Sequence, residues 1–585
     1  MAPLLEVSNL SITFPGSDGE VAAVRGASWQ VGRGQTLGLV GESGSGKSAS
    51  VLAVLGLHGP GTRIEGSIRL AGEELVGAPE ERLRQLRGKN VSMVFQDALD
   101  SLNPFRTVGA QIAEAARLHQ PLSRPAARRK AVEMLERVGI REPQRRAKEY
   151  PHQFSGGMRQ RVMIAAALVN EPAVLLADEP TTALDSTVQA QVLDLLAELQ
   201  RDMGMAVVLV THDFGVVQHV CSDVAVMYRG RVLETGPVED VLQRGRHPYT
   251  RALVASVPTM ADEPGVALPT VARVVEALVG PLDPEQLADP TLRVEAGAVL
   301  AQPSVAQPSV SRAATNGLAQ LGAGPVLDVR GLHVEYPGRL GRSGTAAVQD
   351  VSFTIAPGEA FGLVGESGSG KSTIARVIAG LQVPTTGTVL LDGLDLRAGT
   401  TAQRRVLSRK VQMVFQDPYA SFNPDRTIGD SVGAPLTVRV DGAPSIARAV
   451  LRERVASLLT EVGLEPDLAA AYPDQLSGGM RQRAGIARAL IVEPDLLIAD
   501  EPVSALDVSV QAQVLNLLAD LQERRGLAML FISHDLTVVR HMCTRIAVLA
   551  AGRVVEVGDR AKVMEDPEHD YTRSLLAAAH ILDRS

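Results

Sequence analysis

Short apolar runs along the chain predict buried strands. Residues 37–40, 174–177 and 207–210 are almost entirely apolar and have the length of strands that are covered on both faces. Residues 10–14 instead show partial alternation, which is typical of a strand with one exposed face. The run at 37–40 passes through a glycine-rich stretch into a helical pattern, so the sequence predicts a strand, a tight turn and a helix in that order.

Helical patterns fill the region before residue 150 and return in the second half of the chain. The clearest is an amphipathic stripe with spacings of four, three and four residues, formed by Leu451, Val455, Leu458 and Val462. In the first half, Arg128, Arg129 and Lys130 stand beside a comparable stripe. We interpret these charges as the solvated face of a helix.

The sequence repeats itself at an offset of about 322 residues. Lys47 corresponds to Lys371, and Asp178 corresponds to Asp500. We therefore expect a duplicated domain, with the first copy at residues 1–256, a linker at 257–325 and the second copy at 326–585.

The predicted linker differs from both copies in composition. Ala, Val, Pro, Gly and Gln dominate it, charges are few, and the pentapeptide Ala-Gln-Pro-Ser-Val occurs twice in tandem at 301–310. Apart from a short helix expected at 271–278, we interpret residues 257–325 as an extended, semi-flexible connection.

The glycine-rich stretch Gly-Glu-Ser-Gly-Ser-Gly-Lys-Ser occurs at 41–48 and again at 365–372. Between a strand and a helix this is the pattern of a P-loop, whose backbone N–H groups and helix N-terminus bind phosphate. A loop that merely turns is the alternative, and two copies in the same context disfavour it. We expect a nucleoside triphosphate to be bound at two places. The predicted phosphate-binding residues are Gly41, Ser43, Gly44, Ser45, Gly46, Lys47 and Ser48, with Gly365, Ser367, Gly368, Ser369, Gly370, Lys371 and Ser372.

An acidic pair ends a predicted strand in each half. Asp178 and Asp500, together with the P-loop hydroxyls of Ser48 and Ser372, suit Mg²⁺ ligands. The glutamate after each aspartate can polarise an attacking water. A histidine follows each aspartate after 34 residues. A lone histidine there is more often structural, but its recurrence favours a contact with the γ-phosphate. These residues are Glu179, His212, Glu501 and His534.

Two further features, the Ser-Gly-Gly stretches and two aromatic residues, have both a functional and a purely structural interpretation. Ser-Gly-Gly at 155–157 and 477–479 precedes a helical run with bare N–H groups, so it is either a second anion-binding geometry or simply a capped helix. Phe14 and Tyr336 end predicted strands before a Pro-Gly turn. Either aromatic could stack on a nucleobase, although an aromatic residue at a strand end usually belongs to the core.

The composition is that of an ordinary globular protein. The formal net charge of −8 argues against a nucleic-acid-binding surface as the main function. Two cysteines, Cys221 and Cys543, cannot build a disulfide framework, a zinc ribbon or a cluster site, and they suit a reducing, cytoplasmic compartment. No signal peptide is evident and no apolar run is long enough to span a bilayer, so we expect other chains to supply any membrane-spanning part.

The P-loop, a glutamine after an apolar strand, Ser-Gly-Gly-Met, the acidic pair and the histidine occur twice in this order, and the set resembles the ATP-binding cassette family over both halves. The resemblance implies an α/β fold of two tandem P-loop ATPase domains, each with a RecA-like core, an antiparallel β subdomain and a helical subdomain. It implies ATP and Mg²⁺ as cofactors, with Gln96 and Gln416 among the metal ligands.

The resemblance also implies that the two cassettes pack head to tail. Each ATP would lie between the P-loop of one cassette and the signature helix of the other, which is the helix that begins after Ser155 or Ser477. One site would combine Phe14, Lys47, Gln96, Asp178, Glu179 and His212 with Ser477, Gly478 and Gly479. The other would combine Tyr336, Lys371, Gln416, Asp500, Glu501 and His534 with Ser155, Gly156 and Gly157. Residues 183–185 and 505–507 match the loop that runs along the cassette interface.

Finer features resemble the oligopeptide, dipeptide and nickel importer branch. They are Ser-Leu-Asn-Pro at 101–104, with Ser-Phe-Asn-Pro at 421–424, and His-Pro-Tyr-Thr at 247–250, with His-Asp-Tyr-Thr at 569–572. The resemblance implies the ATPase motor of a bacterial peptide importer at the cytoplasmic face of the membrane. Its partners would be two permease subunits and an extracytoplasmic substrate-binding protein, without nucleic acid. The permeases would dock on the apolar surface loops 97–105 and 417–425, where we expect Leu102 and Phe422 to contribute to coupling. A nickel or glutathione importer of the same branch is the alternative.

Double cassettes outside transport fit less well. A translation factor would show a charged, basic and helical linker, and an excision-repair ATPase would carry Cys-x-x-Cys zinc modules. Many relatives in the peptide branch hold an iron–sulfur cluster in a cysteine-rich tail after the His-Pro-Tyr-Thr element. Here no cysteine follows Tyr249 until Cys543, so we expect no iron–sulfur cluster.

Overall fold

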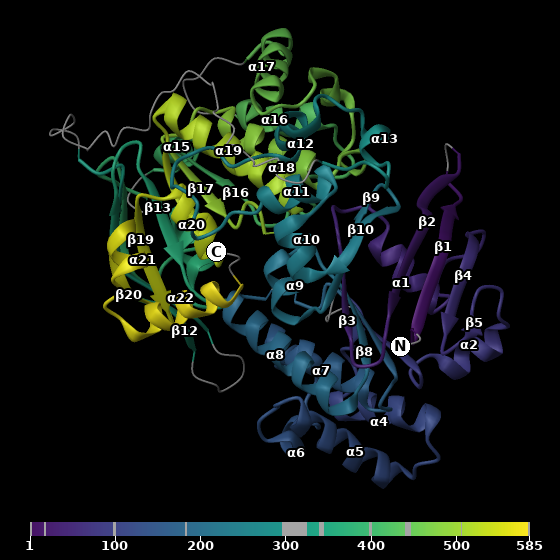
Figure 1. Cartoon of the computed structure of the whole chain (residues 1–585). Coiled ribbons are helices and arrows are strands. Elements are labelled where there is room, and N and C mark those ends of the chain that lie inside the picture. Colours follow the sequence, from purple (N-terminus) through teal and green to yellow (C-terminus); the bar gives the residue numbers. More distant parts are fainter. Residues whose placement is uncertain are drawn as a thin grey trace.

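The computed structural model describes residues 3–16, 19–96, 101–181, 184–294, 324–337, 344–396, 400–438, 446–504 and 506–582. It contains two copies of one α/β unit, the first and the second cassette, which lie against each other (Figure 1). The first is drawn from purple to blue and the second from green to yellow. The duplicated α/β architecture predicted from the sequence is confirmed.

Each cassette is built on a six-stranded sheet with five parallel strands and one antiparallel edge strand. In the first cassette the order is β10 (Arg231–Pro237), β9 (Asp223–Tyr228), β3 (Thr36–Val40), β8 (Ala206–Val210), β7 (Val174–Asp178) and β6 (Val91–Val94). In the second it is β16 (Val411–Val414), β17 (Leu496–Asp500), β18 (Ala528–Ser533), β13 (Ala360–Val364), β19 (Arg545–Ala550) and β20 (Arg553–Asp559). The strands β3, β7 and β8 are buried throughout, which explains why their sequences are continuously apolar.

A four-stranded antiparallel sheet packs beside each core sheet. In the first cassette its order is β2 (Val21–Val31), β1 (Leu5–Phe14), β4 (Arg63–Leu70) and β5 (Glu73–Glu74). In the second it is β12 (Thr345–Ile355), β11 (Leu327–Tyr336), β14 (Thr386–Leu391) and β15 (Leu394–Asp395). The alternation predicted at 10–14 is the inward face of β1, where Leu10 and Ile12 are fully buried.

The helices follow the same duplicated plan. Those of the first cassette are α1 (Lys47–Val54), α2 (Glu80–Leu86), α4 (Val108–His119), α5 (Arg124–Arg137), α6 (Pro143–Arg146), α7 (Gly156–Leu168), α8 (Ser186–Met203), α9 (Phe214–Val220), α10 (Val238–Arg244) and α11 (Pro248–Ala255). Those of the second are α14 (Lys371–Ile378), α15 (Thr401–Lys410), α16 (Ile428–Thr437), α17 (Arg448–Glu461), α18 (Gly478–Leu490), α19 (Val508–Arg525), α20 (Leu536–Met542), α21 (Arg560–Glu565) and α22 (Asp570–Leu582).

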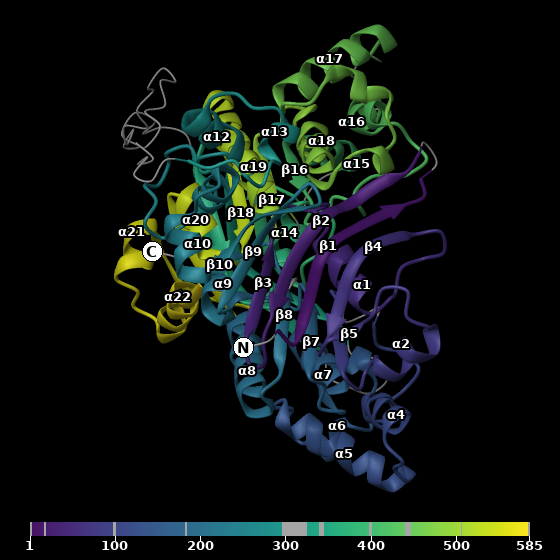
Figure 2. The same ribbon diagram turned by 45° about the vertical axis from the view of Figure 1, so that its right-hand side comes forward.

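Each cassette has a layer of helices beyond its sheets, and the two layers lie at opposite ends of the molecule (Figure 2). Helices α4, α5 and α6 lie at the bottom of that view, and α16 and α17 lie at the top. Val455, Leu458 and Val462 are at most 5% exposed, which confirms the predicted stripe on α17. Arg128 and Arg129 on α5 are exposed, as expected of a solvated helix face.

Residues 257–294 differ from the extended linker that their composition predicted. They contain α12 (Val271–Val279), which confirms the short helix expected there, and α13 (Pro284–Leu287). Val271, Val274 and Val275 form an apolar stripe that packs into one buried cluster with α11. The stripe is short and lies among Pro and Ala residues, so the overall composition hid it. The tandem pentapeptide lies outside the described residues.

The cassettes contact each other through more than their loops. The C-terminal helix α22 of the second cassette packs against α8 and α9 of the first, as both views show (Figures 1 and 2). Within the described ranges, none of the helices combines the length and the apolar character that crossing a membrane requires.

Candidate functional site

The two P-loops connect a buried strand to a helix, as predicted. The first lies between β3 and α1, and its backbone leaves room only for glycine at two points. Gly41 has a φ of 150°, and a Cβ atom there would lie 2.1 Å from the carbonyl oxygen of Met227. Gly46 has a φ of 97° and caps α1, with the Ala23 carbonyl 2.6 Å from a Cβ position. Gly365 repeats the first of these restrictions, so both loops are held in the same curled conformation.

The P-loop lysines fold back onto their own loops. Lys47 Nζ donates to the carbonyls of Gly41 at 2.7 Å and Glu42 at 2.8 Å. Lys371 makes the same two bonds in the second cassette, at 2.6 and 2.9 Å. Burial lowers the pKa of both lysines, against the opposing attraction of nearby carboxylates. Each loop therefore presents a desolvated cation beside inward-curving backbone, which suits a phosphate group.

Four of the six predicted metal ligands meet in pairs, whereas Gln96 and Gln416 bond to Glu179 and Glu501. Ser48 Oγ donates to Asp178 Oδ1 at 3.0 Å, and Ser372 Oγ donates to Asp500 Oδ1 at 3.2 Å. Burial raises the pKa of Asp178, and it raises the pKa of Asp500 to about 6. A hydroxyl and a carboxylate are hard oxygen donors, and a Mg²⁺ ion that also binds substrate phosphates needs few protein ligands. The residues present fit such an ion.

The predicted glutamine, glutamate and histidine also come together in each cassette. Glu179 accepts a hydrogen bond from Gln96 Nε2 at 2.8 Å through one carboxylate oxygen and faces His212 Nδ1 at 3.2 Å through the other. In the second cassette the corresponding distances are 2.7 and 3.3 Å, among Gln416, Glu501 and His534. The arrangement fixes each carboxylate between two polar side chains, so its orientation is set before any substrate binds.

The two glutamates share an uncommon backbone conformation, and each raises the pKa of its neighbouring histidine. Glu179 and Glu501 both have a φ of 46°, a left-handed conformation that is uncommon outside glycine and is concentrated at functional sites. Burial on its own would lower the pKa of His212 and His534, but the neighbouring glutamate raises it above its usual value in both. In the second cassette the pKa of Glu501 is also lowered, against its burial, by His534, so this pair favours a protonated histidine beside an ionised glutamate.

The signature serines cap the helices that follow them. Ser155 Oγ accepts from the Met158 N–H at 3.4 Å, at the start of α7. Gly157 lets α7 pack closely on α8, because a Cβ atom there would lie 2.4 Å from Val188. Ser477 and Gly479 repeat both features in α18. The capped-helix interpretation is correct, and it leaves a role at the nucleotide open because Ser155 and Ser477 remain exposed.

The cassettes exchange reciprocal contacts at their P-loops. The Ser43 N–H of the first cassette donates to Asp507 Oδ1 of the second at 2.7 Å. The Ser367 N–H of the second donates to Asp185 Oδ2 of the first at 3.3 Å. Each aspartate directly precedes the helix on which its own signature helix packs. Each P-loop therefore contacts the segment that directly precedes α8 or α19 of the other cassette.

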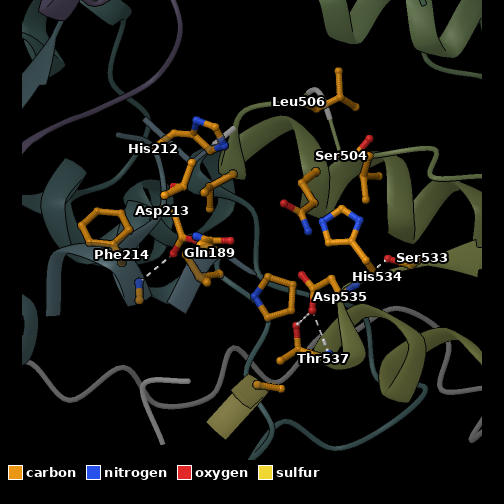
Figure 3. A pocket seen from close by; sticks show the side chains of 18 of the residues that line it. Gln189, His212, Asp213, Phe214, Ser504, Leu506, Ser533, His534, Asp535 and Thr537 are labelled. Atoms are coloured by element: carbon orange, nitrogen blue, oxygen red, sulfur yellow. Dashed lines mark hydrogen bonds between the residues drawn. The ribbon is translucent and has the colours of Figure 1, made fainter. Parts of the chain in front are cut away.

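A cavity of about 190 Å³ lies between the two sites (Figure 3). Its walls come from both cassettes and include His212 and Asp213 on one side and His534 and Asp535 on the other. Figure 3 shows the two histidines on ribbons of different cassettes, facing the same space. One cavity is therefore lined by the predicted histidine of each cassette.

The aromatic candidates occupy equivalent strand ends but different surroundings. Phe14 lies edge-on to His58 with ring centroids 5.4 Å apart, at the margin of the core. Tyr336 is 37% exposed, and its hydroxyl lies 3.5 Å from Thr373 Oγ1. Tyr336 presents an accessible ring, whereas Phe14 is partly used in packing.

The expected permease-docking loops are described only in part, since residues 97–100 lie outside the described chain, as do Ala183 and Ala505 of the interface loops. Leu102 and Phe422, the apolar residues expected on that surface, are only 4% and 6% exposed and belong to the cores of the helical layers. The expectation was wrong for these two residues. Phe105, which is 88% exposed, is the apolar side chain that the first loop presents to solvent.

Sequence reasoning missed the aspartates that follow the two histidines. Asp213 Oδ1 accepts from the Gly215 N–H at 2.8 Å and caps α9, while its Oδ2 accepts from Gln189 Nε2 of α8 at 3.1 Å. Asp535 caps α20 through the Thr537 N–H at 2.9 Å. The signal was available, because the His-Asp pair recurs at the same offset as the histidine alone.

Each copy therefore combines a curled P-loop, an acidic strand end and a glutamate held between two polar side chains. These are features of the P-loop nucleoside triphosphatases. The family model described as ABC transporter matches residues 24–182 and 348–504. A second, described as oligopeptide/dipeptide transporter, C-terminal region, matches residues 233–278 and 555–585. The chain belongs to the ABC transporter family, and it is an ATP-hydrolysing subunit with two fused cassettes.

Two similar proteins match over nearly the whole chain, and a similar solved structure matches part of it. The oligopeptide transport ATP-binding protein OppD of Mycobacterium tuberculosis is 43% identical over 608 residues, covering 99% of this chain and 98% of that protein. The glutathione import ATP-binding protein GsiA of Escherichia coli K12 is 44% identical over 596 residues, covering 100% of this chain and 90% of that protein. A solved structure of a dimeric ATP-binding cassette, in a post-hydrolysis state with ADP and Pi, is 31% identical with a TM-score of 0.37. The match covers 40% of this chain and 98% of the chain in that structure.

Proposed function

We propose that the P-loops form two composite ATP sites, each completed by the signature helix of the other cassette. The observation that carries this proposal is the pair of reciprocal contacts, Ser43 with Asp507 and Ser367 with Asp185. This symmetric exchange supports an arrangement in which each P-loop faces the signature helix of the other cassette.

Each residue of the proposed site has its own role in ATP binding or hydrolysis. The P-loop backbone and its lysine would hold the phosphates, and the serine–aspartate pair would hold Mg²⁺, which would neutralise phosphate charge. Glu179 and Glu501 orient and polarise the attacking water, and the histidine and glutamine beside each glutamate keep it in place. The signature serines and glycines complete the opposite side of the nucleotide, and Phe14 and Tyr336 lie at the strand ends where a base would stack.

Crosslinking tests the composite geometry directly. Cysteines introduced at Ser43 and Ser477 should form a disulfide within one chain when ATP is bound, because these residues belong to the same proposed site. The native thiols compete little, since Cys543 is buried and Cys221 is partly buried. A bridge between cysteines at Ser43 and Ser155, with none between Ser43 and Ser477, would refute the arrangement.

We infer that the chain drives uptake of di- or oligopeptides. The support is the match of the oligopeptide/dipeptide transporter C-terminal region to both cassettes, and the full-length similarity to an oligopeptide and a glutathione import ATP-binding protein. Glutathione is itself a short peptide, so both relatives point to the same chemical class of cargo. A nickel importer of the same branch has no relative among those compared above in its favour.

Two permease subunits and an extracytoplasmic binding protein would complete this importer, with the cassettes attached at the cytoplasmic face of the membrane. Co-purified permeases reconstituted into proteoliposomes, with the binding protein present, should take up labelled tripeptide and glutathione only when ATP is supplied to the cassettes. ATP-dependent uptake of Ni²⁺ without uptake of any peptide would reject the peptide assignment.

A further inference from the structure

The hydroxyl of Tyr571 contacts the second P-loop. Tyr571 lies in the first turn of α22, and its Oη accepts a hydrogen bond from the backbone N–H of Glu366 at 3.1 Å. The carbonyl of Glu366 accepts a bond from Lys371 Nζ at 2.9 Å. The tyrosine therefore fixes the same residue whose carbonyl positions the P-loop lysine.

The next N–H along the loop is held by the other cassette. Ser367 donates to Asp185, and Asp185 directly precedes α8. Helix α22, which carries Tyr571, packs against this same α8 and against α9. Two consecutive N–H groups of the P-loop thus point to two elements that contact each other across the cassette interface. Tyr571 lies where the C-terminal helix, the P-loop and the opposite cassette meet.

The local sequence sets the position of this tyrosine. His569 Nδ1 accepts from the Tyr571 N–H at 3.0 Å, at the start of α22. Glu556 on β20 accepts from the N–H groups of Glu568 and His569, at 2.9 and 3.1 Å. The His-Asp-Tyr-Thr element therefore anchors the helix start to the core sheet, and the tyrosine side chain extends from that anchor to the P-loop.

The first cassette repeats the anchor. His247 Nδ1 accepts from the Tyr249 N–H at 3.1 Å, and Glu234 accepts from the His247 N–H at 3.1 Å. Tyr249 is completely buried, and its ring lies 4.3 Å from that of Tyr228, centroid to centroid. The Tyr249 hydroxyl is buried without a hydrogen-bond partner in the described part of the chain. The first cassette thus repeats the anchor of the tyrosine, whereas the hydrogen bond to the P-loop is made by Tyr571.

We propose that Tyr571 is a positioning residue for the second ATP site, which ties the P-loop to the C-terminal helix that packs on the opposite cassette. This proposal rests on the assignment of the second P-loop to ATP. The tyrosine does not touch the nucleotide. It holds the Glu366 backbone, and with it Lys371, in the conformation that receives the phosphates, and it makes that conformation depend on contact between the cassettes.

The test is ATP binding to the full-length chain with only the second site intact. Lys47→Ala removes the first site, and Glu501→Gln prevents turnover during the titration. In this background Tyr571→Phe keeps the ring and removes only the hydrogen bond, so the Kd for ATP should rise by about twofold to tenfold, as expected for one neutral hydrogen bond. In the hydrolysing chain the same variant should raise KM for ATP while kcat at saturating ATP stays within about twofold.

A matched variant separates positioning from helix stability. Ser574→Ala removes a hydroxyl from the same helix. This hydroxyl donates to the Asp570 carbonyl at 3.0 Å, within the helix itself, so the variant should leave the Kd unchanged. An unchanged Kd in Tyr571→Phe, or an equal rise in both variants, would overturn the inference. If the parent with the single site binds no ATP at all, the assignment of the second P-loop fails, and this inference fails with it.

Discussion

Asn516 on α19 holds both backbone polar groups of Leu268. Its Nδ2 donates to the Leu268 carbonyl and its Oδ1 accepts from the Leu268 N–H, each at 2.8 Å. Leu268 is 4% exposed and belongs to the segment that joins the two cassettes. One side chain of the second cassette therefore fixes the connecting segment as a strand neighbour would, and the segment acts as a structural part of the interface.

Removing this clamp should destabilise the chain. Asn516→Ala leaves a buried N–H and a buried carbonyl without partners, so the free energy of unfolding should fall by about 1–3 kcal/mol. Asn516→Asp replaces the donor by a carboxylate oxygen that faces the Leu268 carbonyl, so it should be at least as destabilising as Asn516→Ala. Urea unfolding measures the effect, with Arg273→Ala on the exposed face of α12 as the control. Equal stability of Asn516→Ala and the wild type would show that the segment contributes nothing to the fold.

The paired glutamates should control hydrolysis without controlling binding. Glu179→Gln together with Glu501→Gln preserves shape and removes the ionised base, so ATP turnover should slow by at least ~10² while the Kd for ATP changes little. Glu198→Gln, on the exposed face of α8, is the control and should keep the wild-type rate. A double variant that hydrolyses ATP as fast as the wild type would remove both residues from the catalytic role.

The sequence predicted these site residues because their signals are local. A P-loop, an acidic strand end and a capped helix each depend on a few neighbouring residues, and the duplication repeated every signal. The contacts of Leu268 with Asn516 and of Tyr571 with Glu366 join residues 248 and 205 positions apart, so no local pattern could show them. The burial of Leu102 and Phe422 likewise depends on how the helical layer packs, and sequence spacing alone placed them wrongly.

The histidine–glutamate pair of the second cassette should give a pH-dependent part of the stability. The pKa of His534 is raised above its usual 6.5. The contribution of His534 to the free energy of unfolding is therefore fully present below pH 6.5 and is lost as the pH rises through the raised pKa. The pKa of Glu501 is lowered from 4.5, so its contribution is present above 4.5 and is lost as the pH falls through the lowered pKa. The pair therefore stabilises most between these two usual values.

Comparison of the wild type with His534→Gln, by unfolding at several pH values, checks this direction of the pH dependence. The difference in the free energy of unfolding should be largest near pH 5.5 and should shrink above neutral pH, because the neutral histidine loses its attraction to Glu501. His219→Gln is a useful comparison, since His219 pairs with Asp194 at 2.7 Å away from the ATP sites. A difference that grows steadily with pH would contradict the assignment of a protonated histidine.

Phe105 should matter for coupling to the membrane subunits. It is 88% exposed beside the loop that follows Gln96, so Phe105→Asp removes an apolar contact without disturbing the core. We expect uptake to fall at least about tenfold while ATP binding by the isolated chain is retained. Leu102→Asp should instead unfold the helical layer, since it buries a charge, and circular dichroism separates the two effects. Wild-type uptake in Phe105→Asp would exclude this side chain from the docking surface.

The two thiols should hold no iron. Cys221 and Cys543 occupy equivalent places in separate cassettes, each packed over a glycine of the central strand: a Cβ on Gly38 or Gly362 would lie 3.2 Å from the facing sulfur. Burial raises the pKa of both thiols well above the usual value, so neither supplies the thiolate that a cluster or a metal requires. Protein purified without oxygen should therefore lack stoichiometric iron and visible charge-transfer absorbance, and its spectrum should match that of a Cys221→Ala, Cys543→Ala variant. Iron at one cluster per chain, lost in that variant, would show that the fold brings these sulfurs to a shared ligand set after all.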